Sequence, residues 1–177
     1  MPTSSVTAWG GAVALQLALD RPALVDHLVF TGGASFDPSG VFAELIESFD
    51  SFDPHSADGT RRHEAYLRVA PDPAARTSLV ARINHLDRSD VGWPQERLAE
   101  LRIPTLLIIG DADVARPEYT VKMFRLLGGG VPGDVIELPP TQLAILPGTT
   151  HEGLLDRSEW LSSMIISFLK RPAPQQG

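Results

Sequence analysis

The chain has 177 residues, of which 43% are hydrophobic and 21% are charged, and its formal net charge is −7. This length suffices for one domain with a real core but is short for two ordinary domains. An acidic surface argues against nucleic acids and anionic membranes as partners, because both require clustered lysine and arginine. The lack of cysteine excludes disulfides, thiolate metal sites and a cysteine nucleophile.

The sequence also lacks the patterns of membrane spans, signal peptides and histidine metal sites. The sequence contains no run of about 18 apolar residues that would predict a transmembrane helix. Its first residues have no basic segment before an apolar one, so they do not predict a signal peptide. His27, His55, His63 and His85 show no pairing at metal-ligand spacing. We therefore expect a cytoplasmic protein that holds no metal and no cofactor.

Helical and apolar segments alternate along the chain. The first predicted helix covers residues 9–20 and is apolar on nearly every side, which is typical of a buried helix. Three short apolar runs follow at 28–30, 106–109 and 143–146, and glycine or Pro-Gly closes each one. Such runs predict strands that are buried on both faces, and the helices between them favour a parallel sheet.

The stretch 34–103 has helical patterns but no run typical of a buried strand. It predicts a helical insertion between the first two apolar runs, within one domain that covers residues 1–177. Further helices are predicted at 117–128, which begins with proline and ends with glycine, and at 158–170, which has an apolar stripe.

Three short motifs stand at the ends of predicted elements. They are Ala8-Trp9-Gly10-Gly11 before the first helix, Gly110-Asp111-Ala112-Asp113 after the second apolar run, and Pro147-Gly148-Thr149-Thr150-His151 after the third. Parallel strands end at one edge of a sheet, so side chains that follow them are brought together there.

In this order, the motifs resemble those of the α/β-hydrolase superfamily, in its lipase/esterase-like branch, from the nucleophile elbow onward. The resemblance covers nearly the whole chain. It implies a partial α/β-hydrolase fold, a mostly parallel sheet flanked by helices, with 34–103 as a helical cap or lid. It also implies a catalytic triad in which a carboxylate orients an imidazole that takes the proton of a serine hydroxyl.

The resemblance assigns a role to particular residues. Asp113 stands at the position of the triad acid, and His151 stands at that of the triad base. Asp111 is the competing carboxylate, which as a turn residue would cap the following loop, and the alternative for His151 is a surface loop. The N–H of Trp9 would form half of the oxyanion hole. Trp93 would belong to the lid over the substrate, or would pack the insertion on the core.

The front of the chain departs from the family pattern. When the elbow Gly-x-Ser-x-Gly-Gly is aligned on Gly10-Gly11, Ala8 occupies the nucleophile position and Val6 occupies the first glycine position. The hydroxyl is missing, and a β-branched residue crowds a tight turn. Neither Ser5 nor Thr7 has the small neighbours that an elbow needs. The family's strands before the elbow, with one oxyanion-hole loop, have no counterpart, so we expect a sheet truncated at its N-terminal side.

Two functional hypotheses follow, and they leave open whether the chain is an enzyme. The first is a hydrolase of a small ester- or amide-type substrate that uses a Ser-His-Asp triad and is inactive as given, because Ala8 replaces the serine. The second is a non-catalytic, hydrolase-like chain that binds a small molecule or a protein partner through its open sheet edge. An unpaired apolar edge favours self-association, so we also expect a homo-oligomer.

Overall fold

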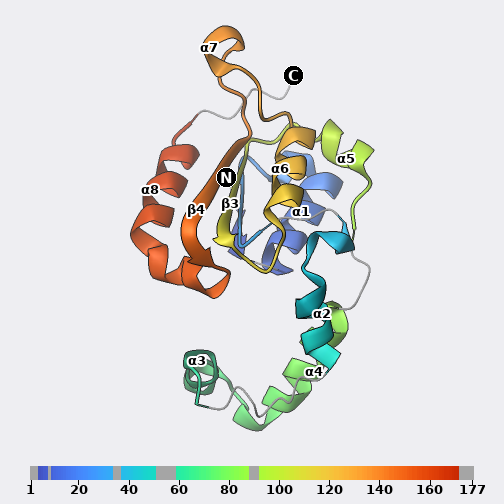
Figure 1. The fold of residues 1–177 in the computed structure, drawn as a ribbon, viewed down its shortest axis with the longest axis vertical. Helices are drawn as coiled ribbons and strands as arrows, with labels where there is room; N and C mark the ends of the chain where they lie inside the picture. Colours follow the sequence, from blue (N-terminus) through green and yellow to red (C-terminus); the bar gives the residue numbers. More distant parts are fainter. Residues whose placement is uncertain (1–3, 8, 34–36, 51–58, 88–91, 172–177) are drawn as a thin grey trace. The chain divides into compact units, whose positions relative to one another are not determined.

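The computed structural model describes residues 4–7, 9–33, 37–50, 59–87 and 92–171 (Figure 1). The chain divides into two compact units. Unit 1 consists of Met1–Val41 and Val91–Gly177, and unit 2 is Phe42–Asp90. None of the described helices is both long and apolar enough to cross a lipid bilayer.

A parallel sheet forms the centre of unit 1. Its strands are β1 (Ser4–Thr7), β2 (Leu28–Thr31), β3 (Thr105–Ala112) and β4 (Gln142–Thr150). They lie in the order β1-β2-β3-β4, and each neighbouring pair is parallel. The three apolar runs of the sequence lie within β2, β3 and β4, which confirms the predicted α/β class and its parallel strands. The strands β3 and β4 extend past those runs into the motifs that follow.

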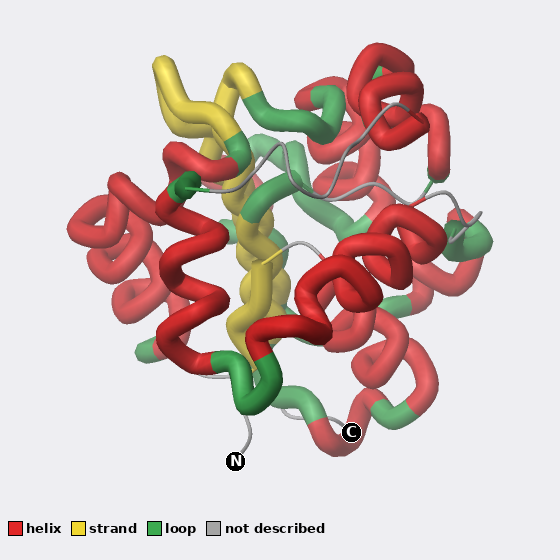
Figure 2. Tube along the Cα trace, turned by 90° about the horizontal axis from the view of Figure 1, so that it is seen from below, coloured by secondary structure: helices red, strands yellow, loops and turns green. Residues whose placement is uncertain are grey.

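Helices cover both faces of this sheet (Figures 1 and 2). On one face lie α1 (Trp9–Asp20), α5 (Gln95–Glu100) and α6 (Pro117–Leu126), and on the other lies α8 (Ser158–Leu169). Short helical turns complete unit 1: η1 (Pro22–Leu24), η2 (Pro38–Gly40), α7 (Gly133–Ile136) and η5 (Glu152–Arg157).

Alternation along the strands divides the core into two clusters. Leu28 and Phe30 of β2 belong to the cluster on the α1 side, whereas Val29 between them belongs to the cluster on the α8 side. Successive side chains of a strand point to opposite faces, so a strand covered by helices on both faces is apolar at every position. This arrangement explains why the strands read as continuous apolar runs.

Helix α1 differs from its sequence-based expectation. Ala14, Leu15 and Ala18 are buried, but Val13 is 70% exposed and Leu17 is 39% exposed. The expectation of a helix buried all round was therefore wrong. The helix packs one face on the sheet. Within the described part of the chain its other face is exposed, which its apolar composition does not predict.

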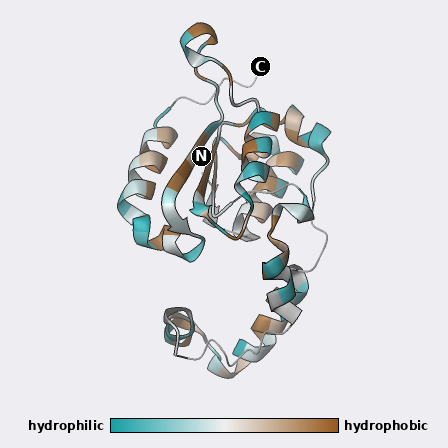
Figure 3. Cartoon of the chain, viewed as in Figure 1, coloured by the Kyte–Doolittle hydropathy of each residue, from teal (hydrophilic) through white to brown (hydrophobic). Residues whose placement is uncertain are grey.

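The described elements of unit 2 are all helices, and they carry both hydrophilic and hydrophobic residues (Figure 3). Unit 2 contains α2 (Ala43–Asp50), α3 (Arg61–Val69), η4 (Pro73–Ala75) and α4 (Arg76–Asp87). None of its described side chains is buried. Helix α5 also falls within the predicted insertion 34–103 but belongs to unit 1. The role of unit 2 as a cap stays a prediction.

Substitution of Leu107 tests how much the core of unit 1 contributes to the free energy of unfolding. The Leu107 side chain is fully buried in β3, and Leu107→Ala should lower the free energy of unfolding by about 2–5 kcal/mol, because it leaves a cavity among packed side chains. Urea unfolding followed by tryptophan fluorescence measures this loss. Val135→Ala is the control, because Val135 is 82% exposed, and it should change stability by no more than about 0.5 kcal/mol. Equal losses in both variants would contradict this assignment of the core.

Candidate functional site

The ends of two neighbouring strands bring Asp113 and His151 together. Asp113 follows the last residue of β3, and His151 follows the last residue of β4. Because the two strands are parallel neighbours, both residues lie at the same edge of the sheet. The distance from His151 Nδ1 to Asp113 Oδ1 is 2.9 Å. The predicted meeting of these two side chains is confirmed, whereas their catalytic roles stay a prediction.

The carboxylate of Asp113 lies in a buried environment. Its side chain is fully buried, whereas that of His151 is 25% exposed. Asp113 Oδ1 also accepts the backbone N–H of Ala115 at 3.2 Å, while Oδ2 has no hydrogen-bond partner within the described residues. A buried carboxylate is costly without donors, so the imidazole and this N–H stabilise it. In return, a carboxylate at Nδ1 favours the tautomer that carries its proton on Nδ1 and its lone pair on Nε2.

Two successive glycines after β2 make room for this pair. Gly32 and Gly33 have φ values of +91° and +76°, in the left-handed region. A Cβ atom at Gly32 would lie 2.8 Å from His151 Cε1, and one at Gly33 would overlap the Cβ of Ala115. The sequence identified these glycines only as the turn that closes a strand. The close approach of Gly32 to the imidazole is a feature that the sequence did not predict.

The junction of β1 and α1 lies at the same edge of the sheet. The last residue of β1, Thr7, pairs with Thr31, the last residue of β2, and α1 begins at Trp9. A strand followed by a helix at this edge is the order of elements around a nucleophile elbow, and the elbow itself stays a prediction. Ala8, the residue at the nucleophile position, lies outside the described residues, as does the side chain of Trp9. The oxyanion role of the Trp9 N–H stays a prediction.

Trp93 lies in the core of unit 1. It is 8% exposed, it packs in the cluster on the α1 side, and its indole N–H donates to Gln16 Oε1 at 2.9 Å. These contacts favour the packing alternative over a place in a lid. The sequence left both alternatives open, because Trp93 lies in the predicted insertion and only the tertiary fold shows that this part of it joins the core.

Comparison with known proteins bears on the fold. No family model and no curated protein matches the sequence. Solved structures do match. One is CarC, a serine hydrolase involved in carbazole degradation, with a TM-score of 0.60 and 19% identity over 96% of this chain and 65% of that chain. A second is the 2-hydroxy-6-oxo-6-phenylhexa-2,4-dienoate hydrolase BphD from Rhodococcus sp. strain RHA1, with a TM-score of 0.60 and 20% identity over 96% of this chain and 64% of that chain. A third is an α/β-hydrolase from a deep-sea metagenome library, with a TM-score of 0.58 and 14% identity over 95% of this chain and 66% of that chain.

The fold is that of the α/β-hydrolases. The agreement covers nearly all of this chain, which spans 64–66% of the length of these three structures. A partial α/β-hydrolase fold was the expectation from the three motifs, and it is confirmed. At 20% identity and below, the likeness establishes the fold and leaves activity and substrate as separate questions.

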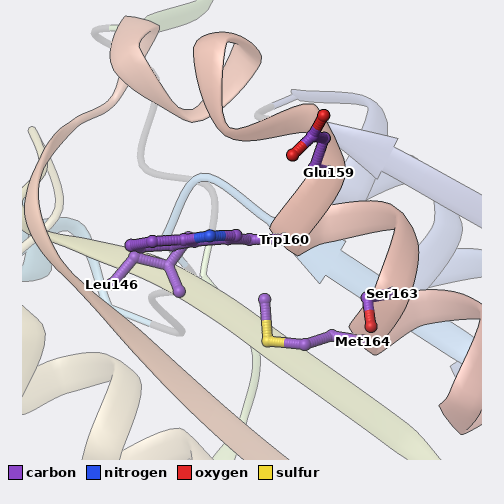
Figure 4. Close-up of a pocket in the computed structure, with 5 residues that line it drawn as sticks. All are labelled: Leu146, Glu159, Trp160, Ser163 and Met164. Atoms are coloured by element: carbon purple, nitrogen blue, oxygen red, sulfur yellow. The ribbon is translucent and has the colours of Figure 1, made fainter.

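A surface hollow of about 290 Å³ lies between β4 and α8. Figure 4 shows its lining, in which the indole of Trp160 extends from α8 toward Leu146 of β4. Glu159, Ser163 and Met164 complete the lining. None of these residues is among the predicted site residues. The hollow is therefore distinct from the Asp113–His151 pair, and we assign no role to it.

Gly32 offers a test of the contact between the β2 turn and the imidazole. Gly32→Ala should displace the His151 ring and weaken its hydrogen bond to Asp113, because the new methyl group would lie 2.8 Å from Cε1. The low-field proton resonance of a hydrogen-bonded His151 Nδ1–H should broaden or vanish in NMR spectra.

Gly128→Ala provides the matched control for this substitution. Gly128 has a similar φ of +85°, so its backbone strain is comparable, but a Cβ atom there would meet nothing within 4 Å. The His151 resonance should persist in this variant. An unchanged resonance in Gly32→Ala would show that the glycine does not govern the position of the ring.

Proposed function

We propose that Asp113 and His151 are the acid and the base of a Ser-His-Asp triad, and that the parent chemistry is hydrolysis of a small ester- or amide-type substrate. The observation that carries the proposal is the hydrogen bond between His151 Nδ1 and Asp113 Oδ1, at 2.9 Å, beside the strand–turn–helix junction of an α/β-hydrolase fold. This is the edge at which such enzymes assemble their catalytic groups.

The geometry supports a defined sequence of proton transfers. Nε2 of His151 would take the proton of a nucleophilic hydroxyl as its oxygen attacks the substrate carbonyl, and would then donate that proton to the leaving group. Water would release the acyl group by the same steps. The carboxylate of Asp113 would hold the tautomer and stabilise the imidazolium, without taking the proton itself.

We further propose that the chain as given is inactive, because Ala8 occupies the nucleophile position. A methyl group has no oxygen with which to form the acyl intermediate, and removal of the serine from such a triad costs about 10⁶ in kcat. Val6, at the first glycine position of the elbow, adds a second obstacle because a branched side chain crowds the turn.

The names of the structural neighbours support a carbonyl compound as the substrate class. CarC is described as a serine hydrolase, BphD as a dienoate hydrolase, and another neighbour, from Bacillus subtilis, as a carboxylesterase (TM-score 0.56, 17% identity). These activities share attack on a carbonyl carbon. For this chain, we therefore propose the reaction class and leave the acyl group unspecified.

The inactivity can be tested with p-nitrophenyl acetate. The wild-type chain and Ala8→Ser should both turn over this ester no faster than His151→Ala. The wild type lacks the serine, and Ala8→Ser still has a branched residue, Val6, at the first glycine position of the elbow. Absorbance of the released nitrophenolate measures the rate. Turnover in Ala8→Ser that disappears in the double variant with His151→Ala would contradict the expected inactivity of the serine variant and would at the same time support the triad assignment.

Wild-type turnover gives a separate outcome. If His151→Ala abolishes it, Ser5, Thr7 or another hydroxyl serves as the nucleophile, and the proposal that Ala8 silences the chain is wrong.

The edge of the sheet favours a second candidate function, binding of a protein partner. Among the strands that the structure describes, β1 pairs with β2 and with no other strand. An open strand edge can pair with a further chain, and we propose a second copy of this chain as that partner. Sequencing of the coding DNA upstream of Met1 would separate the two candidates. An in-frame extension that encodes strands and a His-Gly loop favours the hydrolase, and a stop codon favours the partner.

Light scattering tests self-association directly. At micromolar concentration, the purified chain should have at least twice the mass of a single chain of 19.1 kDa, because edge pairing buries the open side of β1. A monodisperse monomer would contradict this candidate.

A further inference from the structure

The pairing of β3 with β4 is irregular just before the candidate site. Gly110 pairs with Leu146, and the next paired residues are Ala112 and Thr150. Between these two points, β3 advances by two residues while β4 advances by four. The extra length of β4 forms a bulge over residues 147–149, directly before His151. Bulges of this kind change the direction in which the following side chains point.

The carboxylate of Asp111 binds the backbone of this bulge. Asp111 Oδ1 accepts the N–H of Thr149 at 3.1 Å. Hydrogen bonds from the backbone of Gly148 and Thr149 lower the pKa of Asp111, so its carboxylate is ionised at neutral pH. Gly148 has a φ of +57°, in the left-handed region. Asp111 therefore accepts a peptide N–H of the neighbouring strand, and does not merely cap its own turn.

Further contacts restrain the same segment of β4. A Cβ atom at Gly110 would overlap the carbonyl group of Thr149, so only glycine permits this close approach of the two backbones. The side chain of Thr149 is buried, and its hydroxyl donates to the carbonyl oxygen of Pro147 at 3.0 Å. The close approach at Gly110 and the hydrogen bond to the Asp111 carboxylate together fix the bulge against β3.

We propose that Asp111 is a positioning residue for His151. Its carboxylate fixes the Gly148–Thr149 backbone, and this backbone places the imidazole two residues later, against Asp113. In this arrangement the two carboxylates of the Gly-Asp-Ala-Asp motif have separate tasks. Asp113 contacts the imidazole itself, whereas Asp111 contacts the loop that carries it.

The consequence for a reaction rests on the proposed function. Misplacement of a catalytic group by about 1 Å can cost on the order of 10²-fold in rate. The structural part of the proposal does not depend on catalysis, because the position of the imidazole can be measured in the chain as it exists.

The test compares two replacements of Asp111. In Asp111→Asn, the amide oxygen can still accept the N–H groups of the bulge, whereas Asp111→Ala removes the acceptor. Two NMR readouts are followed in the full chain: amide hydrogen exchange at Thr149 and the low-field resonance of His151 Nδ1–H. Asp134→Ala is the matched control, because Asp134 is an exposed carboxylate on the short helix α7.

Asp111→Ala should speed exchange at the Thr149 amide about tenfold, as expected for the loss of one hydrogen bond, and should broaden or abolish the His151 resonance. Asp111→Asn and Asp134→Ala should keep both readouts close to the wild type. An unchanged His151 resonance in Asp111→Ala would overturn the proposal, even if Thr149 exchanges faster, because the backbone would then be anchored without any effect on the ring.

A further variant covers the case in which Asp111→Ala fails to fold. Asp111→Glu retains the charge but moves the acceptor by one methylene group, so it should shift the His151 resonance while the chain stays folded. An unshifted resonance would again overturn the proposal. Because neither readout requires turnover, the test of Asp111 gives its answer whether or not any variant hydrolyses an ester.

Discussion

The Asp113 carboxylate has no contact with solvent, and it meets the imidazole of His151 at 2.9 Å. A buried charge of this kind is tolerated only when donors face it, so the strands that carry the two residues must end at the same place. The parallel pairing of β3 with β4 satisfies this condition. The turn after β2 must also leave space for the imidazole, and the end of β4 must place the imidazole within hydrogen-bond distance of Asp113.

Close backbone approaches at glycine residues provide the space for the Asp113–His151 pair and for the loop before it. Glycine stands at the three positions where the chain approaches the pair or its loop most closely: Gly32 beside the imidazole, Gly33 beside Ala115, and Gly110 beside Thr149. At each one a single methyl group would collide with a neighbour. The position of the Asp113–His151 pair therefore depends on the backbone around it as well as on the hydrogen bond between the two side chains. This distribution is expected where the placement of a side chain matters to within a fraction of an ångström.

The sequence predicted the parts of this molecule that depend on local pattern. The apolar runs became β2, β3 and β4, and the order of the motifs predicted that Asp113 and His151 would meet. Features that depend on tertiary contacts were harder to predict. Trp93 resembled a lid residue but packs in the core, and α1 has an open face that its composition does not reveal. Asp111 resembled a turn residue because the donor that its carboxylate binds, the N–H of Thr149, lies 38 positions further along the chain, in the neighbouring strand.

The residues that flank unit 2 in the sequence are held by contacts inside unit 1. Before it, Val41 forms a bridge with Ala115, and the carbonyl oxygen of Gly40 accepts the N–H of Arg116. After it, Trp93 is held by Gln16. The described residues of unit 2 contribute no buried side chain to this framework. Because the residues on either side of unit 2 are held by contacts inside unit 1, a change in the length of the segment between them need not disturb the sheet.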